Sequence, residues 1–321
     1  MIFGVKMTIL WKNRQKCEFL FSIFFNMRIF LTGGTGFIGH FVAKEFLTRG
    51  HSLKILARNP NKIPSLTVHK NVEMIHAGLL DLEAIEKGLD GCEACVHVAL
   101  GWGETPLTML ANDTTATVQL LELAAKNGCE KFVYTSSTAA FGKIRNGANE
   151  NMVCIPQDLY GATKAASEAY VLGFSNMKRN IIRPGYTFGH LAFPDGITQP
   201  DRRFFNIAKA VKENRAVHLT KHDGTQFIHA SQLAKLYAAV LESECNEEVF
   251  FGLGTEWISW KSIAERAIKF CLGSKAVIEE EDKGWGKEPC LFSLEKIDKF
   301  FGFKFNGNDF IDEHVKWNLE L

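Results

Sequence analysis

Apolar positions follow two alternating patterns through the first half of the chain. Short apolar runs typical of buried strands alternate with stretches in which apolar residues recur every three to four positions, as on one face of a helix. The runs predict strands over residues 28–31, 53–57, 72–75, 95–99, 131–135 and 181–183, and the helical spacing predicts helices over 37–49, 82–89 and 115–126. Such alternation produces a parallel sheet with right-handed crossovers and helices on both faces. The sequence therefore predicts an α/β fold with a doubly wound parallel sheet.

The pattern changes after about residue 186, where mixed loops and helices replace the regular alternation. The cluster Phe193-Pro-Asp-Gly196 is typical of a loop. We expect residues 186–321 to form a smaller C-terminal substrate-binding portion over the carboxyl edge of the sheet, with a return to the sheet near 222–255.

Residues 1–26 precede the first strand and form a basic, aromatic extension of doubtful function. Their longest apolar stretch is too short to span a bilayer, and no small-residue cleavage site follows it as in a signal peptide. We expect the functional domain to begin at Met27, with the extension a misassigned start or a dispensable arm. A weak interfacial membrane anchor is the alternative.

Composition and charge are those of an ordinary globular protein. The 321 residues are 46% hydrophobic and 23% charged, with a formal net charge of +1. This balance offers no electrostatic attraction to nucleic acid or to a membrane. The eight cysteines do not form a disulfide framework in a chain of this length, which favours a cytoplasmic location. Cys92 and Cys95 form a C-x-x-C without a second pair, so a structural role is favoured over redox or zinc chemistry.

Three glycines, Gly33, Gly36 and Gly39, join the first strand to the first helix. In a dinucleotide-binding unit, the first glycine permits a tight turn, the second lets backbone N–H groups approach a pyrophosphate and the third lets helix and strand pack closely. The helix N-terminus then presents the positive end of its dipole to the phosphates. The position between strand and helix favours a nucleotide site over a simple structural turn. Residues 27–185 are therefore predicted to form an NAD(P)-binding Rossmann domain.

Arg58 follows the second strand, at the place where an acidic residue would hold the ribose 2′-OH of NAD. A cation at this place suits the 2′-phosphate of NADP. The sequence therefore favours NADP as the cofactor, and NAD is the alternative. The alternative is a solvated arginine at a strand end.

Tyr160 and Lys164 open a helical pattern at i, i+4 spacing, so their side chains lie on one helix face. A phenol is a poor acid or base at neutral pH, and a neighbouring ammonium favours its phenolate. Upstream, Ser137 ends the strand that reads Val133-Tyr-Thr-Ser-Ser137. A hydroxyl at the carboxyl end of a sheet faces the ligand crevice and can polarise a substrate carbonyl. These three residues are the predicted catalytic group.

With these motifs, the chain resembles the extended short-chain dehydrogenases/reductases, in the NAD-dependent epimerase/dehydratase family. The resemblance covers residues 27 to about 255 and continues faintly to the C-terminus. Its motifs are Thr32-Gly-Gly-Thr-Gly-Phe-Ile-Gly39, Val96-His-Val-Ala99, Thr135-Ser-Ser137, Tyr160-x-x-x-Lys164, Arg183-Pro-Gly185, and weaker echoes at Phe227-Ile-His-Ala230 and Phe251-Gly-Leu-Gly254.

The resemblance implies that Tyr160 transfers a proton, that Lys164 holds the nicotinamide ribose and lowers the pKa of the tyrosine, and that Ser137 orients a small-molecule substrate. It also implies a possible homodimer. The implied cofactor site comprises Thr32, Gly33, Thr35, Gly36, Phe37, Ile38, Gly39, Arg58, Asp81, Leu82, Val98, Ala99, Tyr160, Lys164, Pro184 and Gly185.

The chain departs from the family pattern at several positions. Gly78 stands where the family often has an aspartate near the adenine, and Asp113 stands where it often has an asparagine. In the segment that begins Phe227-Ile-His-Ala230, Ser231-Gln232 stands where the family often has an acidic residue. Gly224-Thr-Gln226 lacks the arginine with which sugar-nucleotide enzymes commonly meet a diphosphate, although Arg202 or Arg203 could reach one.

Four further residues bear on the predicted site. Phe141 replaces a tyrosine that is common in the family, so a contact through that hydroxyl is lost. Trp102 either lines the substrate pocket or only caps the sheet. His218 and His222 have metal-ligand spacing, but the residues around them predict a strand and a turn, so we expect no metal site.

Three functions follow from these motifs. The first is an NADP-preferring oxidoreductase that transfers hydride to or from a carbonyl or alcohol substrate with a Ser-Tyr-Lys site. The second is an NDP-sugar epimerase or dehydratase with tightly held NAD. The third is a non-catalytic NADP-binding regulator, for which the presence of both Tyr160 and Lys164 is unfavourable.

Overall fold

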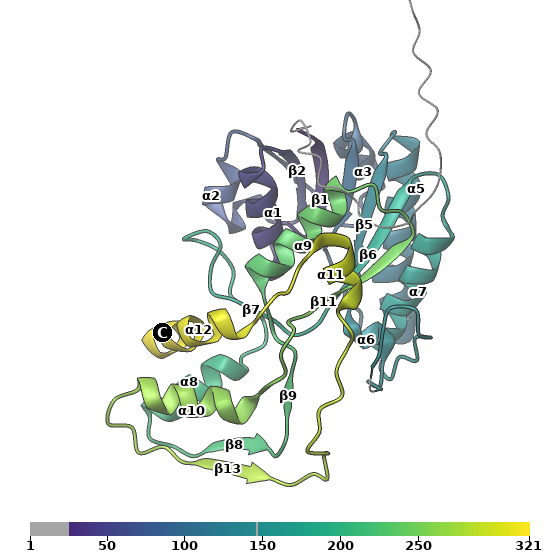
Figure 1. The fold of residues 1–321 in the computed structure, drawn as a ribbon. Helices are drawn as coiled ribbons and strands as arrows, with labels where there is room; N and C mark the ends of the chain where they lie inside the picture. Colours follow the sequence, from purple (N-terminus) through teal and green to yellow (C-terminus); the bar gives the residue numbers. More distant parts are fainter. Residues whose placement is uncertain (1–25, 146) are drawn as a thin grey trace, which may run out of the picture.

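The computed structural model describes residues 26–145 and 147–321 and contains a doubly wound parallel sheet (Figure 1). Its strand order is β11-β6-β5-β4-β1-β2-β3, and all neighbouring strands are parallel. The strands are β1 (Arg28–Thr32), β2 (Ser52–Ala57), β3 (Val72–His76), β4 (Ala94–His97), β5 (Lys131–Thr135), β6 (Lys178–Pro184) and β11 (Glu248–Gly252). The predicted Rossmann fold is confirmed.

Helices cover both faces of this sheet because successive side chains of each strand point to opposite faces. Ile29 and Leu31 of β1 belong to the core under α1 and α9, whereas Phe30 between them belongs to the core under α3, α5 and α7. These helices are α1 (Phe37–Thr48), α3 (Leu82–Leu89), α5 (Ala116–Lys126), α7 (Leu159–Gly173) and α9 (Ala230–Glu242). Short elements between them are η1 (Pro60–Lys62), α2 (Pro64–Thr67), α4 (Pro106–Met109), the π-helix η2 (Leu110–Thr115) and α6 (Thr138–Phe141).

A second, smaller layer lies below the carboxyl edge of the sheet (Figure 1). Its core gathers aromatic side chains such as Phe188, Phe204, Phe227 and Trp260. It contains β7 (Thr187–Phe188), α8 (Arg203–Lys212), β8 (Val217–Thr220), β9 (Gly224–Thr225), β10 (Ile228–His229), β12 (Ile258–Ser259), α10 (Trp260–Phe270), β13 (Ile278–Glu281) and α12 (Asn308–Glu320), while α11 (Glu295–Phe301) packs on β11. The division of the chain at residue 185 stays a prediction.

Most predicted element ends lie within one or two residues of the observed ones, with β6 the main exception. It begins at Lys178, three residues before the apolar run, because its polar start is satisfied by the turn that leads into β11. Arg179 pairs with Glu247 at 2.9 Å, and the Asn180 amide donates to the Cys245 carbonyl at 2.9 Å. Hydrophobic periodicity does not detect a strand whose polar side chains are paired in this way.

Two further sequence predictions concern the N-terminal extension and His218. The expected extension of residues 1–26 lies almost entirely outside them. Among the described residues, no helix is long and apolar enough to cross a membrane. His218 lies in the expected strand, in an ion pair with Glu279 at 3.2 Å.

Candidate active site

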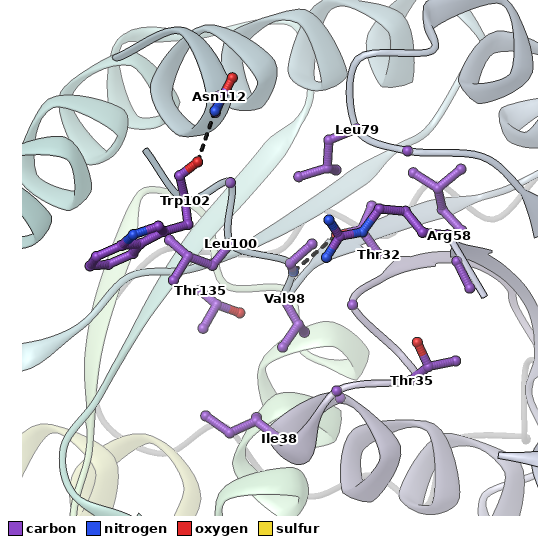
Figure 2. A pocket seen from close by; sticks show the side chains of 18 of the residues that line it. Thr32, Thr35, Ile38, Arg58, Leu79, Val98, Leu100, Trp102, Asn112 and Thr135 are labelled. Carbon is purple, nitrogen blue, oxygen red and sulfur yellow. Dashed lines mark hydrogen bonds between the residues drawn. The ribbon is translucent and has the colours of Figure 1, made fainter. Parts of the chain in front are cut away.

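A cleft of about 1240 Å³ opens at the carboxyl edge of the parallel strands, where doubly wound sheets bind ligands. Figure 2 shows side chains that line it, with Arg58 at one end and Trp102 at the other. Every residue of the predicted catalytic and cofactor sites lines this cleft, so the fold brings all of them together. Their individual roles stay predictions.

The glycine loop forms the tight turn between β1 and α1. Gly33 has a φ of +72°, and a Cβ added to it would lie 2.5 Å from the Ala99 nitrogen. A Cβ on Gly39 would lie 1.9 Å from the Gly33 oxygen. The N-cap residue of α1 is Gly36, and no side chain caps the helix. The free N–H groups at this helix start can therefore donate hydrogen bonds to phosphate oxygens, and the cradle fits a dinucleotide.

Arg58 and Lys62 place two positive side chains at the β2 end of the cleft. Arg58 follows β2 directly and is exposed. A Cβ on Gly78 would lie 3.8 Å from the Cγ of Arg58, so the arginine stem passes over this glycine. Asp81 lies close by in sequence, but its carboxylate caps α3 by accepting from the Ala84 nitrogen at 3.1 Å. Sequence reasoning missed Lys62, although its position four residues after Arg58 was a visible signal.

Tyr160 and Lys164 lie in the first turns of α7, one turn apart. Asp158 fixes the start of this helix because its carboxylate accepts from the Gly161 nitrogen at 2.6 Å. Burial raises the pKa of the Tyr160 phenol, and a hydrogen bond with Ser137 lowers it in part. Ser137 is itself held as the N-cap of α6, where its hydroxyl accepts from the Ala139 nitrogen at 3.1 Å. The three predicted catalytic side chains therefore share one end of the cleft.

Asp113 is the partner of Lys164, and sequence reasoning left its role open. Its carboxylate lies 3.3 Å from the Lys164 ammonium, and it also accepts from the Gly101 nitrogen at 3.1 Å. Burial lowers the pKa of Lys164, and Asp113 raises it in part. Asp113 lies in the π-helix η2, a rare distortion that recurs at functional sites.

A buried hydrogen-bonded chain supports the cleft from below. The Thr32 hydroxyl lies 2.6 Å from Nδ1 of His97, and Nε2 of His97 lies 3.1 Å from the Thr117 hydroxyl. Thr117 in turn donates to the Asp113 carbonyl at 2.7 Å. Burial lowers the pKa of His97 to about 3, so its imidazole is neutral at neutral pH. These hydrogen bonds fix β1, β4 and η2 relative to one another.

A second cleft of about 410 Å³ adjoins the first and shares Ser137 and Gly185 with it. It lies between α6 and the smaller layer. Its lining residues are Ser137, Thr138, Ala139, Gly142, Ile144, Gly185, Tyr186, Arg203, Asp223, Gly224, Thr225, Trp260 and Phe292. It therefore meets the first cleft at the predicted catalytic serine.

Three other residues singled out in the sequence are Trp102, Phe141 and Cys92. Trp102 lines the first cleft, is 63% exposed, and its carbonyl accepts from the Asn112 amide at 2.8 Å (Figure 2). Phe141 is buried, in an aromatic cluster with Phe251 and Phe292. Burial raises the pKa of the Cys92 thiol to about 11, as expected for a structural cysteine.

Glycine loop, sheet-edge cleft and Ser/Tyr/Lys group together define a dinucleotide-binding Rossmann protein. Residues 29–251 match the model of the family described as NAD dependent epimerase/dehydratase family. The chain belongs to this family, whose members found in the comparisons below are enzymes.

Two curated relatives and one solved structure illustrate the family range. The 3 beta-hydroxysteroid dehydrogenase/Delta 5→4-isomerase of Mycobacterium tuberculosis is 28% identical over 179 residues, 51% of this chain and 48% of the relative. The UDP-glucose 4-epimerase of Corynebacterium glutamicum is 26% identical over 283 residues, 74% of this chain and 79% of the relative. The structure of UDP-glucuronic acid 4-epimerase from Bacillus cereus in complex with NAD is 20% identical, with a TM-score of 0.75 over 92% of this chain and 99% of that one.

These similarities differ in what they establish. The chain spans about half the length of the first curated relatives that it matches. At 20% identity the solved structure shows the shared fold alone. The family and its Rossmann fold are therefore established, and the substrate has to be argued from this chain's own residues.

Proposed function

We propose that the protein is an NADP-preferring oxidoreductase that transfers hydride to or from a carbonyl or alcohol substrate. The observation that carries the proposal is Arg58, which lies after β2 at the end of the cleft opposite Trp102. An arginine at this place suits a 2′-phosphate, whereas NAD-specific sites commonly place a carboxylate there. Lys62 adds a second positive charge nearby.

Gly78 supports the same reading. The family often has an aspartate here, and a carboxylate so close to Arg58 would pair with the guanidinium and compete with a phosphate. Glycine instead leaves the Arg58 stem unobstructed, 3.8 Å from where a Cβ would lie. The departure at residue 78 and the arginine at residue 58 are therefore consistent with each other.

The catalytic proposal assigns one role to each side chain at the other end of the cleft. The bound nicotinamide supplies hydride exchange, and the protein manages the proton and the substrate oxygen. Tyr160 gives or takes the proton, and Ser137 donates a hydrogen bond to the substrate oxygen. Lys164 favours the phenolate through its positive charge, and Asp113 holds that ammonium in place.

An NDP-sugar epimerase or dehydratase with tightly held NAD is the second candidate. The comparisons taken alone back it better than they back a reductase, because sugar-nucleotide enzymes recur among the similar structures. Against it stand Arg58 and the amide of Gln226 where such enzymes commonly carry an arginine. That amide is occupied, because it donates to the Gly254 and Phe292 carbonyls at 3.1 and 3.2 Å.

Cofactor titration tests the proposal. Purified protein is titrated with NADPH and NADH by calorimetry, as wild type and as Arg58→Asp. We expect NADPH to bind the wild type at least about tenfold more tightly than NADH, since a phosphate–arginine contact is charge-assisted and bidentate. Arg58→Asp should abolish that preference.

Arg145→Asp is the matched control, because Arg145 lines neither cleft and donates to the Val153 carbonyl. It should leave the cofactor preference unchanged. Equal or tighter binding of NADH by the wild type, or NAD that co-purifies and does not dissociate, would refute the proposal and favour the sugar-nucleotide alternative. Stoichiometric oxidation of NADPH with an aldehyde would then separate a reductase from an enzyme that recycles its own cofactor.

A further inference from the structure

We propose that the second cleft selects substrates without negative charge and excludes a nucleoside diphosphate. This inference rests on the proposed reductase function and names its substrate class: uncharged carbonyl compounds with an apolar or aromatic body. It is carried by the arrangement of Arg203, Asp201 and Asp223.

The positive side chain of this cleft, Arg203, is already paired with a carboxylate. Arg203 and Asp223 are the charged residues among those that line it. Nε of Arg203 lies 3.0 Å from one carboxylate oxygen of Asp201 and 3.3 Å from the other, and the Arg203 backbone nitrogen donates to the same carboxylate at 2.8 Å. The aspartate therefore holds the arginine through both its side chain and its main chain.

Two aromatic rings contact the same guanidinium. The Arg203 guanidinium carbon lies 4.8 Å from the centre of the Tyr186 ring and 4.4 Å from that of Trp260. Such contacts stabilise a cation and fix its orientation. Movement of Arg203 toward a diphosphate would therefore break the ion pair and both ring contacts.

Asp223 adds a second carboxylate to this wall. The backbone of Asp223 is anchored, because its carbonyl accepts from the Trp260 nitrogen at 3.0 Å. Asp223 and Arg203 line the same cleft, where burial raises the pKa of the aspartate and Arg203 lowers it in part. With Asp201 and Asp223 ionised, one arginine faces two carboxylates, and a diphosphate would meet a net negative site.

The rest of the lining is neutral and partly apolar. Ala139, Ile144 and Phe292 provide apolar surface, and Thr138 and Thr225 provide hydroxyls. Arg202, which could have reached a diphosphate, lines neither cleft and packs over Phe205 with its guanidinium carbon 3.9 Å from the ring centre. The chemistry of the cleft therefore matches an uncharged ring or chain with a hydroxyl or amide at its far end.

A pair of isosteric aldehydes tests the inference. The rate of NADPH oxidation is measured with 4-carbamoylbenzaldehyde and 4-carboxybenzaldehyde, which have the same shape and differ in charge. We expect kcat/KM to be at least about tenfold higher for the amide compound, because like charges in an interface are strongly unfavourable. Asp223→Asn should reduce this ratio at least about threefold by improving the carboxylate substrate. Asp90→Asn, an exposed aspartate before β4 at the opposite edge of the sheet, is the matched control.

Binding of UDP to the NADP-saturated protein is the second measurement, and it does not depend on turnover. We expect a Kd weaker than about 1 mM for the wild type and at least about tenfold tighter binding by the Asp201→Asn/Asp223→Asn double variant. A rate ratio near one, a ratio unchanged by Asp223→Asn, or tight UDP binding by the wild type would overturn the inference. If neither aldehyde is reduced while UDP binding behaves as expected, the reductase proposal fails and the charge selection stands.

Discussion

The Lys164 ammonium lies 3.3 Å from a carboxylate oxygen of Asp113, and the side chains are 3% and 0% exposed. A buried ammonium is costly unless a carboxylate compensates it. The same carboxylate works against the tyrosine, because a negative charge nearby raises the pKa of Tyr160 in addition to the effect of burial. The partner of the lysine therefore opposes deprotonation of Tyr160.

Asp113→Asn should shift the pH dependence of catalysis toward lower pH. The change keeps the shape of the side chain and removes one of the causes that raise the pKa of Tyr160. In the reducing direction Tyr160 must be protonated, so activity falls as pH rises through its pKa. We expect the alkaline limb of the kcat profile to move down by about one pH unit, the usual spread that neighbours impose on such groups.

The control for this variant is again Asp90→Asn, which should leave the profile in place. An Asp113→Asn enzyme that loses thermal stability without any displacement of the alkaline limb would show that Asp113 is only structural. The same profile measured in the oxidising direction should show its rising limb displaced in the same sense, because the tyrosine then acts as the base.

Gly39→Ala should abolish cofactor binding, because a Cβ at this position would lie 1.9 Å from the Gly33 oxygen. The backbone of the turn must move, which we expect to cost about 2–4 kcal/mol of folding free energy. Gly173→Ala is the matched control: this glycine also lies in a helix, and outside its own helical turn no described residue lies within 4 Å of its Cβ position. Calorimetric titration with NADPH measures binding, and urea unfolding measures stability. Wild-type affinity in Gly39→Ala would contradict the role given to the turn.

The sequence predicts the parts of the site that depend on short-range geometry. Gly33, Gly36 and Gly39 lie within seven positions, and Tyr160 and Lys164 lie one helical turn apart, so spacing alone constrains how they meet. Parallel strands also share one edge for their carboxyl ends, which is why Ser137 could be placed in the same cleft as the glycines.

Residue spacing does not predict contacts between segments that are far apart in the sequence. Asp113 and Lys164 are 51 positions apart, and their distance depends on the π-helix, which periodicity does not reveal. The contact between Arg203 and Trp260 in the second cleft likewise depends on how α8 and α10 pack in the smaller layer. Such relations follow from tertiary packing, so the sequence indicated the cofactor half of the site more fully than the substrate half.

Glu168→Gln should destabilise the protein strongly. Glu168 on α7 forms a bidentate pair with Arg183 on β6, with Nε–Oε1 and Nη2–Oε2 distances of 2.8 and 2.7 Å. Both side chains are nearly fully buried, so the substitution leaves an uncompensated guanidinium, which typically costs about 3–5 kcal/mol. Urea unfolding measures the loss, and kcat should fall as well because α7 carries Tyr160.

The control for the buried pair is Glu83→Gln, which removes an exposed i, i+4 partner of Lys87. Exposed ion pairs contribute little to the free energy of unfolding, so the unfolding midpoint of Glu83→Gln should stay close to that of the wild type. Equal effects of the two substitutions would mean that the Arg183 pair does not tie α7 to the sheet.

His97→Gln should weaken the pH dependence of folding stability. His97 is neutral in the folded protein, with a pKa lowered to about 3, whereas an unfolded histidine takes up a proton near pH 6.5. The unfolded chain therefore binds more protons between these values, and the contribution of His97 is complete above pH 6.5 and decreases as pH falls toward 3. In this range each such histidine contributes a slope of about 1.4 kcal/mol per pH unit. Urea unfolding at several pH values from 7 to 5 should show a shallower decline for His97→Gln than for the wild type, and parallel declines would show that His97 does not set this dependence.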